Sequence, residues 1–294
     1  FSPAVESEVA RQAVLREEAG GGPRARVLAL FTVAGQAGAF TGPLLGALLL
    51  TADFRTVCLA GAAVFTAVLV GHAVLLPRHI PGREPVAVRG GLGPLLRNRR
   101  FLALCCGYGA QLLAYNQFYL ALPAEVRRAY GSQAPVAWLF ALSSLLVVGA
   151  QLPVTRWADR RLTPRRSLAA GLLLTGTGFA TVAAVRPAGL TGMAGLVPLA
   201  ALVVLLTAGQ MLVAPVARAW LPDLAEPGRI GLYTGALSSV SGLLVLLGST
   251  ASGALLDLGL PPALPWAALA AVPLAAILLL PGQRPTHDTA PEPA

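Results

Sequence analysis

The sequence has 294 residues, of which 55% are hydrophobic and 12% charged, and its mean hydropathy is +0.69. This composition excludes an ordinary soluble globular protein and predicts a membrane protein. The formal net charge is +9, but the basic residues fall in short segments between apolar runs without interleaved aromatic residues, which argues against nucleic-acid binding.

Eight apolar runs are long enough to cross about 30 Å of hydrocarbon as helices. In chain order they lie near residues 27–50, 56–77, 101–122, 136–155, 167–185, 193–216, 231–255 and 264–281. The sequence therefore predicts an all-α polytopic membrane protein, and an even number of crossings places both ends of the chain on the same side.

The arginines predict which side that is. All 22 basic residues are arginine, and 18 of them fall before the first run, between alternate runs or after the last one. The other four face the opposite side: Arg55, Arg127, Arg128 and Arg186. Because basic residues near span ends favour the cytoplasm, we expect both termini to be cytoplasmic in a multi-pass protein of the cell membrane.

An internal repeat relates the beginning of the chain to its last third. The segment Gly46 to Leu49 reads GALL, as does the segment Gly253 to Leu256, and Gly35 aligns with Gly242. Both copies have the same orientation, which is typical of parallel repeats in transporters. The second copy is preceded by about four more spans than the first, so we expect about four spans to be absent before Phe1.

Two motifs then resemble the major facilitator superfamily, whose plan is two parallel halves of six spans. GAFTGPLLG, from Gly38 to Gly46, resembles the antiporter motif of the fifth span, although its last glycine is replaced by Ala47. The matching residues are Gly38, Gly42, Pro43 and Gly46. RWADRRLTPRR resembles the loop signature in its second-half copy, with a threonine at Thr155 in place of the leading glycine. Its matching residues are Asp159, Arg160, Arg165 and Arg166.

The resemblance covers nearly the whole chain and implies a domain plan. RNRRFLALCCGYGAQLLAYNQFYLALP also resembles the seventh span of drug:proton antiporter-like members. The plan has spans 5 and 6 in 1–77, a cytoplasmic linker in 78–100, spans 7 to 12 in 101–281 and a disordered cytoplasmic tail in 282–294. About eight of twelve spans are thus expected in this chain.

Each motif has a structural and a functional interpretation. The glycine stripe around Pro43 is either a tight helix contact or a seal that holds the two halves together in one state of the transport cycle. Asp159 is either a solvated charge or a latch at the cytoplasmic N-terminus of the span that begins near Arg26, where a helix dipole favours a carboxylate. The family's analogous loop is implicated in the conformational cycle.

The seventh span carries the candidate substrate residues. Tyr108, Gln111, Tyr115 and Tyr119 share a helix face, and further uncharged polar groups lie beside that face or on other spans. These additional residues are Asn116, Gln117, Gln151 and Gln210. They either bond neighbouring helices or line a central cavity. A lining without fixed charge suits bulky, amphipathic solutes that are neutral or weakly cationic.

The function expected from these features is secondary active transport, most of all proton-coupled efflux of small amphipathic molecules, drugs or metabolites, by alternating access. The sequence has no phosphate-binding GK[ST] loop, no metal-ligand pairs and no GxSxG motif, so we expect no cofactor, no metal and no enzyme activity. A proton-linked metabolite importer, or an intramembrane enzyme or sensor, are the alternatives. No acidic residue lies at mid-membrane, so the proton-coupling carboxylate is expected in the absent spans.

Overall fold

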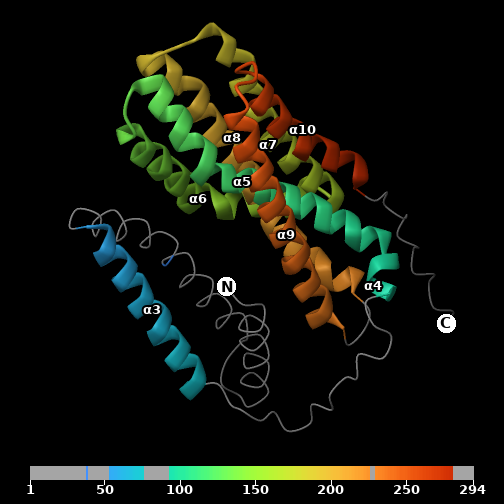
Figure 1. The fold of residues 1–294 in the computed structure, drawn as a ribbon. Coiled ribbons are helices and arrows are strands. Elements are labelled where there is room, and N and C mark those ends of the chain that lie inside the picture. The colour runs from blue at the N-terminus through green and yellow to red at the C-terminus, as the bar shows by residue number, and fades with distance from the viewer. Residues whose placement is uncertain (1–37, 39–52, 76–92, 226–228, 281–294) are drawn as a thin grey trace, which may run out of the picture. The chain divides into compact units, whose positions relative to one another are not determined.

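The computed structural model describes Gly38 and residues 53–75, 93–225 and 229–280, and all structural statements below concern these residues. The chain divides into two compact units, Phe1–Arg89 and Gly90–Ala294, each of which is described by itself. Figure 1 shows that nearly all the described residues are helical. The prediction of an all-α membrane protein is confirmed.

The first unit contributes α3, Phe54–Leu75. Asp53 caps this helix, because its Oδ1 accepts a hydrogen bond from the backbone N–H of Thr56 at 2.6 Å. Hydrogen bonds from the side chain and backbone of Thr56 hold the pKa of Asp53 below its usual value of 3.8. The first predicted span, 27–50, lies outside the described residues apart from Gly38, which is helical and exposed.

The second unit is a bundle of apolar helices. In chain order its elements are α4 (Gly93–Arg97), α5 (Arg99–Tyr130), α6 (Ala134–Arg161), α7 (Pro164–Val185), the 3₁₀ turn η1 (Arg186–Ala188), α8 (Gly192–Leu224), α9 (Ile230–Asp257) and α10 (Leu264–Leu279). Together with α3, the helices α5 to α10 coincide with seven of the eight predicted spans. Within the described residues, α6 to α9 are long and apolar enough to cross a membrane.

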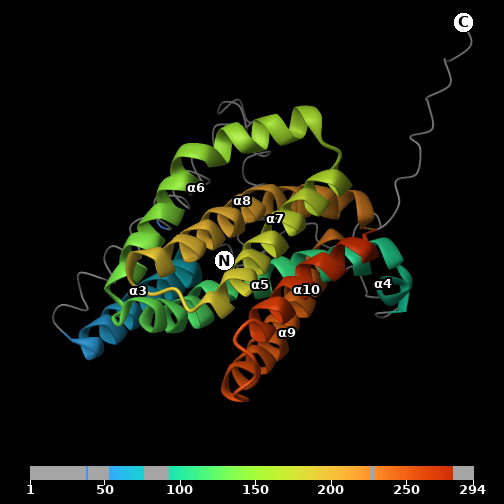
Figure 2. The same ribbon diagram turned by 90° about the horizontal axis from the view of Figure 1, so that it is seen from above.

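Helix α5 runs through the middle of the bundle. It packs against α8, α9 and α10, while α7 packs against α8 and α10, and α6 packs mainly against α8. Figure 2 shows α6 and α9 on opposite sides of this unit. Most of the residues of α6 and α9 remain outside the packed interior. Helix α5, the most polar of the long helices, is therefore the one with the most helical neighbours. This is expected because lipid offers no hydrogen bonds to polar side chains.

Both ends of α5 are fixed by specific residues. Asn98 accepts a hydrogen bond from the N–H of Phe101 at 3.1 Å and donates one to the carbonyl of Leu224 at 3.0 Å, so it caps α5 and ties it to the end of α8. At the other end Gly131 adopts φ +84°, and its N–H bonds the carbonyl of Arg127 at 2.9 Å. A side chain there would be strained, so glycine ends the helix.

Helix α5 is longer than predicted. The apolar run was expected to end at residue 122, but the helix continues to Tyr130. Val126 and Ala129 extend its buried face, with 0% and 3% of their surfaces exposed. Charged residues follow the predicted end of the run at residue 122. They fit into the helix because Glu125 is paired with Arg128 and Arg186.

The segment that resembles the superfamily's loop signature is mostly helical. Asp159 and Arg160 lie in the last turn of α6, and Arg165 and Arg166 lie in the first turn of α7. Only Leu162 and Thr163 connect the two helices. Thr163 caps α7 by accepting a hydrogen bond from the N–H of Arg166 at 3.4 Å, and Pro164 fits the first helical position.

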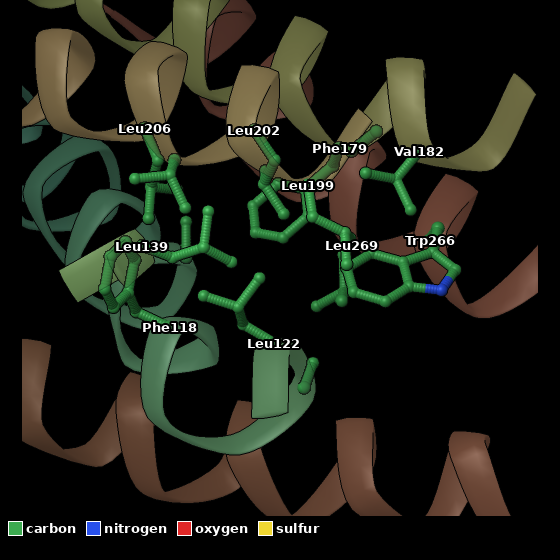
Figure 3. Close-up of a cluster of buried hydrophobic side chains, with 14 of the residues drawn as sticks. Phe118, Leu122, Leu139, Phe179, Val182, Leu199, Leu202, Leu206, Trp266 and Leu269 are labelled. Carbon is green, nitrogen blue, oxygen red and sulfur yellow. The ribbon is translucent and has the colours of Figure 1, made fainter. Parts of the chain in front are cut away.

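Two apolar clusters fill the bundle, one toward each end. Figure 3 shows the cluster at the end where α5 terminates, with contributions from α5, α6, α7, α8 and α10. The rings of Phe179 and Trp266 stack there with centroids 6.2 Å apart. In the second cluster, Phe101 and Tyr233 meet edge to face at 4.7 Å. Leu95 of α4 is buried in this second cluster, so the end of the predicted linker packs on the second unit.

Helices α7 and α8 approach each other closely at a pair of glycines. A Cβ added to Gly171 would lie 2.7 Å from the carbonyl oxygen of Gly209, and one added to Gly209 would lie 2.6 Å from that of Gly171. A Cβ added to Gly209 would also overlap the hydroxyl of Thr175. Inside lipid, close packing of small residues is a main source of helix association. These two glycines therefore fix the spacing of α7 and α8.

Candidate functional site

The two glutamines of α5 are buried between helices. Gln111 has 1% of its surface exposed, and its Oε1 accepts a hydrogen bond from the Thr175 hydroxyl at 2.8 Å. Gln117 is 2% exposed, and its Nε2 lies 3.5 Å from the carbonyl of Leu113. Nε2 of Gln111 and Oε1 of Gln117 have no hydrogen-bond partner among the described residues. Each buried orphan atom of this kind costs about 1–3 kcal/mol.

The remaining amides of the predicted cavity join other pairs of helices. Asn116 of α5 donates to the hydroxyl of Ser249 on α9 at 2.8 Å. Gln151 of α6 donates to Thr155 at 3.0 Å and to the carbonyl of Met211 on α8 at 3.3 Å. Gln210 is half-buried on α8.

In this conformation, then, most of the predicted amides bond neighbouring helices and do not converge on one hollow. Gln111 serves the α5–α7 contact, Asn116 the α5–α9 contact and Gln151 the α6–α8 contact. A role in substrate binding remains a prediction for all of them.

The predicted tyrosines divide into two groups. Tyr108 is half-buried and packs against the second apolar cluster. Tyr115 and Tyr119 belong to an aromatic group with Phe118 and Phe140, in which Tyr119 is 58% exposed. Sequence reasoning had placed Tyr115 and Tyr119 on one face but had not found Phe140, because α6 and α5 meet only in the folded bundle.

The two family motifs are visible only in part. Asp159, Arg160, Arg165 and Arg166 are all exposed. The predicted partner of Asp159, near Arg26, lies outside the described residues. Of the glycine motif, Gly42, Pro43 and Gly46 also lie outside them, and a Cβ added to Gly38 would meet nothing within 4 Å.

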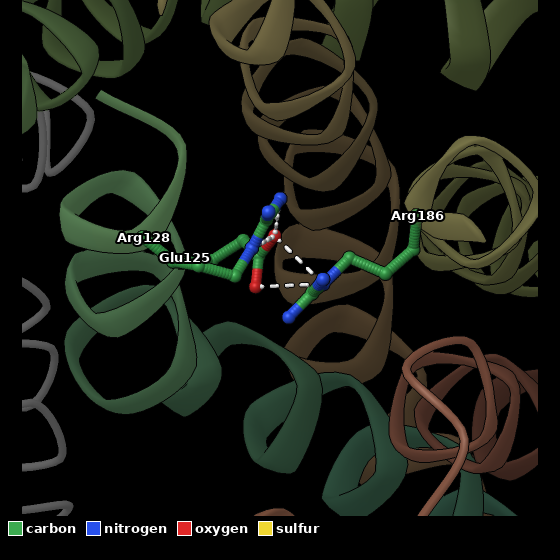
Figure 4. Close-up of polar contacts among 3 residues, drawn as sticks. All are labelled: Glu125, Arg128 and Arg186. Carbon is green, nitrogen blue, oxygen red and sulfur yellow. Dashed lines mark hydrogen bonds and ion pairs between the residues drawn. The ribbon is translucent and has the colours of Figure 1, made fainter. Parts of the chain in front are cut away.

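A buried ion cluster at the end of α5 was not predicted. Glu125 has only 8% of its side chain exposed, and Oε1 lies 2.6 Å from Nη2 of Arg128 and 2.9 Å from Nε of Arg186. Figure 4 shows the two guanidinium groups reaching the carboxylate from α5 itself and from the end of α7. The signal in the sequence is that Glu125 lies three residues before Arg128, and that Arg186 is predicted to lie on the same side of the membrane.

The ion cluster closes this end of the bundle. A hollow of about 10 Å³ remains beside it, lined by Glu125, Arg128 and Arg186 together with Gly195 and Leu199. That volume is about enough for one water molecule. Within the described ranges, His, Cys, Asp and Glu side chains form no group of three or more that could hold a metal ion.

Comparison with known proteins places this bundle in a family. The family model described as Major Facilitator Superfamily matches residues 104–294. The chain belongs to the major facilitator superfamily. It is therefore a member of a family of multi-pass membrane transporters, as the two motifs indicated. No solved structure matches it at a significant level.

Its relatives include proteins named for drug resistance. It is 30% identical over 263 residues to the multidrug resistance protein MdtH of Aeromonas hydrophila, which covers 87% of this chain and 64% of that protein. It is 32% identical over 260 residues to MdtH of Klebsiella pneumoniae, covering 87% and 63%. An uncharacterized MFS-type transporter of Mycobacterium tuberculosis is 32% identical over 267 residues, covering 87% and 61%. The chain thus spans less than two thirds of the length of these relatives.

Proposed function

We propose that this protein is a secondary active transporter that exports small amphipathic molecules, drugs among them, in exchange for protons. The observation that carries the proposal is the 30–32% identity, over 87% of the chain, to proteins named multidrug resistance protein MdtH. We propose that the protein is a transporter and not an enzyme. Its substrates are neutral or weakly cationic, because α5 has no charged residue between Arg100 and Glu125.

The transport cycle requires two states of the protein, and the two motifs are the elements that we assign to the switch. The glycine stripe from Gly38 to Gly46 seals the two halves in one state by close backbone contact. Asp159, exposed at the end of α6, binds the N-terminus of the span near Arg26 while the cytoplasmic ends are together. Opening toward the cytoplasm breaks that contact, so Asp159 biases the equilibrium between the states.

The location follows from the arginines. The protein lies in the cell membrane, and the short connection between α6 and α7 is cytoplasmic because five arginines from Arg156 to Arg166 flank it. With an even number of spans, both ends of the chain are then cytoplasmic. The end where α5 terminates then faces outward. Efflux by alternating access needs no nucleotide or metal, since the proton gradient supplies the free energy.

Growth of a bacterial host that lacks its own multidrug pumps tests the function. Expression of the full-length protein should raise the inhibitory concentration of several unrelated amphipathic compounds, and an uncoupler should remove the effect. The same host with an empty vector is the control. Unchanged resistance to every compound, with the protein present in the membrane, would contradict the proposal. Import of a compound in intact cells, instead of its expulsion, would contradict the direction.

A further inference from the structure

Five exposed arginines gather where α6 ends and α7 begins. Arg160 and Arg161 occupy the last turn of α6, and Arg165 and Arg166 the first turn of α7, with only two residues between the helices. The Cα atoms of Arg161 and Arg165 therefore lie within about 14 Å of each other, the longest reach of the chain between them. We call this group the basic corner, and its members are Arg156, Arg160, Arg161, Arg165 and Arg166.

The backbone of the basic corner is held by hydrogen bonds. The N–H of Leu162 bonds the carbonyl of Ala158 at 2.8 Å, and the N–H of Ser167 bonds the carbonyl of Thr163 at 2.9 Å. Ser167 is buried and donates its hydroxyl to the carbonyl of Leu212 on α8 at 3.2 Å, which anchors the start of α7. The two helix ends therefore hold the arginines close together in spite of their mutual repulsion.

The positive charge of the basic corner is largely uncompensated. Asp159 is the one carboxylate between Arg156 and Arg166, so five arginines and one aspartate give this segment a net charge of +4. Neither Asp159 nor any of the five arginines forms an ion pair or a side-chain hydrogen bond within the described part of the chain. An anion from outside the protein would therefore relieve the repulsion among the arginines.

Two exposed tryptophans of α6 indicate the depth of this corner in the membrane. Trp157 is 54% exposed near the end of α6, and Trp138 is 80% exposed near its beginning. About 28 Å of helix separates them, which is close to the hydrocarbon thickness of about 30 Å. Tryptophan favours the boundary between hydrocarbon and headgroups. Arg160 and Arg161, one turn beyond Trp157, then lie level with the headgroup phosphates.

We propose that the basic corner, together with Trp157, binds the headgroup of an anionic phospholipid of the cytoplasmic leaflet. Guanidinium groups form paired hydrogen bonds with phosphate oxygens, and clustered basic residues beside a span attract anionic lipids. A zwitterionic headgroup is disfavoured because the arginines repel its cationic part. A phospholipid fits better than a free phosphate ion, since its acyl chains also contact the indole of Trp157. This proposal goes beyond the transport function and does not depend on it.

Quenching of tryptophan fluorescence by lipids with brominated acyl chains tests the contact in the purified full-length protein in nanodiscs. The fluorescence lost in Trp157→Phe isolates the signal of Trp157, and that lost in Trp138→Phe isolates the signal of Trp138. Brominated phosphatidylglycerol should associate with Trp157 about fivefold more strongly than brominated phosphatidylcholine. At Trp138, at the other end of the same helix, the two lipids should differ by less than about twofold.

Charge variants show whether the arginines cause this preference. The double variant Arg161→Gln with Arg165→Gln should reduce the preference at Trp157 to below about twofold, whereas lysine at both positions should keep most of it, because the charge remains. Arg55→Gln with Arg127→Gln is the matched control. It removes two exposed arginines on the side of the protein assigned to the exterior, and it should leave the preference at Trp157 unchanged.

Several results would overturn the proposal. Equal association of the two lipids with Trp157, or an unchanged preference in the double glutamine variant, would show that the basic corner does not select anionic lipid. Absence of quenching at Trp157 by either lipid would show that this surface faces protein. Loss of the preference on addition of inorganic phosphate would show a site for a small anion instead of a lipid. The growth test of transport is independent of all these outcomes.

Discussion

Glu125 shows how a single charged residue can be accommodated in an apolar bundle. Its carboxylate receives hydrogen bonds from Nε of Arg128 at 2.7 Å and from Nε of Arg186 at 3.1 Å. Because the carboxylate is almost fully buried, its desolvation is offset only while these bonds persist. Removing one arginine therefore leaves an under-compensated buried charge.

We expect Arg186→Ala to destabilise the protein by about 2 kcal/mol, less than a fully buried pair would lose because Arg186 is 19% exposed. The double variant Glu125→Gln with Arg186→Gln should recover part of this loss, since no buried carboxylate remains. Thermal unfolding in detergent measures both. Arg127→Ala, at an exposed neighbouring position, is the control and should change stability by less than about 0.5 kcal/mol. Equal effects of Arg127→Ala and Arg186→Ala would contradict a specific role for the ion cluster.

Gln111 has an unpaired buried amide nitrogen, which lowers stability, and it is also a predicted substrate-binding residue. Its Nε2 is buried without a partner in the described part of the chain, although Thr175 satisfies Oε1. We expect Gln111→Leu to change the stability of the protein by less than about 1 kcal/mol, because it removes the orphan donor but leaves the buried hydroxyl of Thr175 without its acceptor. If the amide also meets substrate in another state of the cycle, the same variant should lose most of its transport. Unfolding midpoints and export rates, measured on one preparation, separate the two roles.

Full transport by Gln111→Leu would show that Gln111 acts only in helix contacts. Gln151→Leu is a useful comparison, because both hydrogen bonds of Gln151 are made and its replacement should destabilise the α6–α8 contact.

At the scale of the helices, the sequence predicts where each helix begins and ends better than which residues contact one another. The lengths of the apolar runs place α3 and α5 to α10 within a few residues at most ends. The partners of individual residues depend on which helices cross, and that information is not local. The crossing of Gly171 with Gly209 illustrates this, because neither glycine lies in the motif stripe that sequence reasoning selected.

We expect Gly209→Ala to destabilise the α7–α8 contact by about 1–3 kcal/mol, because the new methyl group would overlap Thr175 and the Gly171 carbonyl. Gly149→Ala on α6 is the matched control. A Cβ there meets nothing within 4 Å, so alanine should be neutral or stabilise the helix by up to about 1 kcal/mol. Unfolding of the two variants in the same detergent makes the comparison. Equal stability of the two would exclude a close backbone approach at Gly209.

For the whole molecule, the fold class and the family followed from the spans, the repeat and two short motifs. The candidate site followed only in part. The spacing of Tyr115 and Tyr119 on α5 predicts that they share a face, but the contact with Phe140 and the Glu125 cluster depend on the packing of α6 and α7 against that helix. A substrate role of the amides remains a prediction, and their separate partners on α7, α8 and α9 could not be read from one helix.

The orientation in the membrane is a prediction for the whole molecule. If α5 ends outside, Ser132, in the exposed connection between α5 and α6, should be extracellular, whereas Arg161, exposed at the end of α6, should be cytoplasmic. In a variant without the native cysteines, Ser132→Cys should react with a membrane-impermeant maleimide in intact cells. Arg161→Cys should react only after permeabilisation, and four arginines still flank its connection. The reverse pattern would invert the assigned topology and with it the side on which the Glu125 cluster lies.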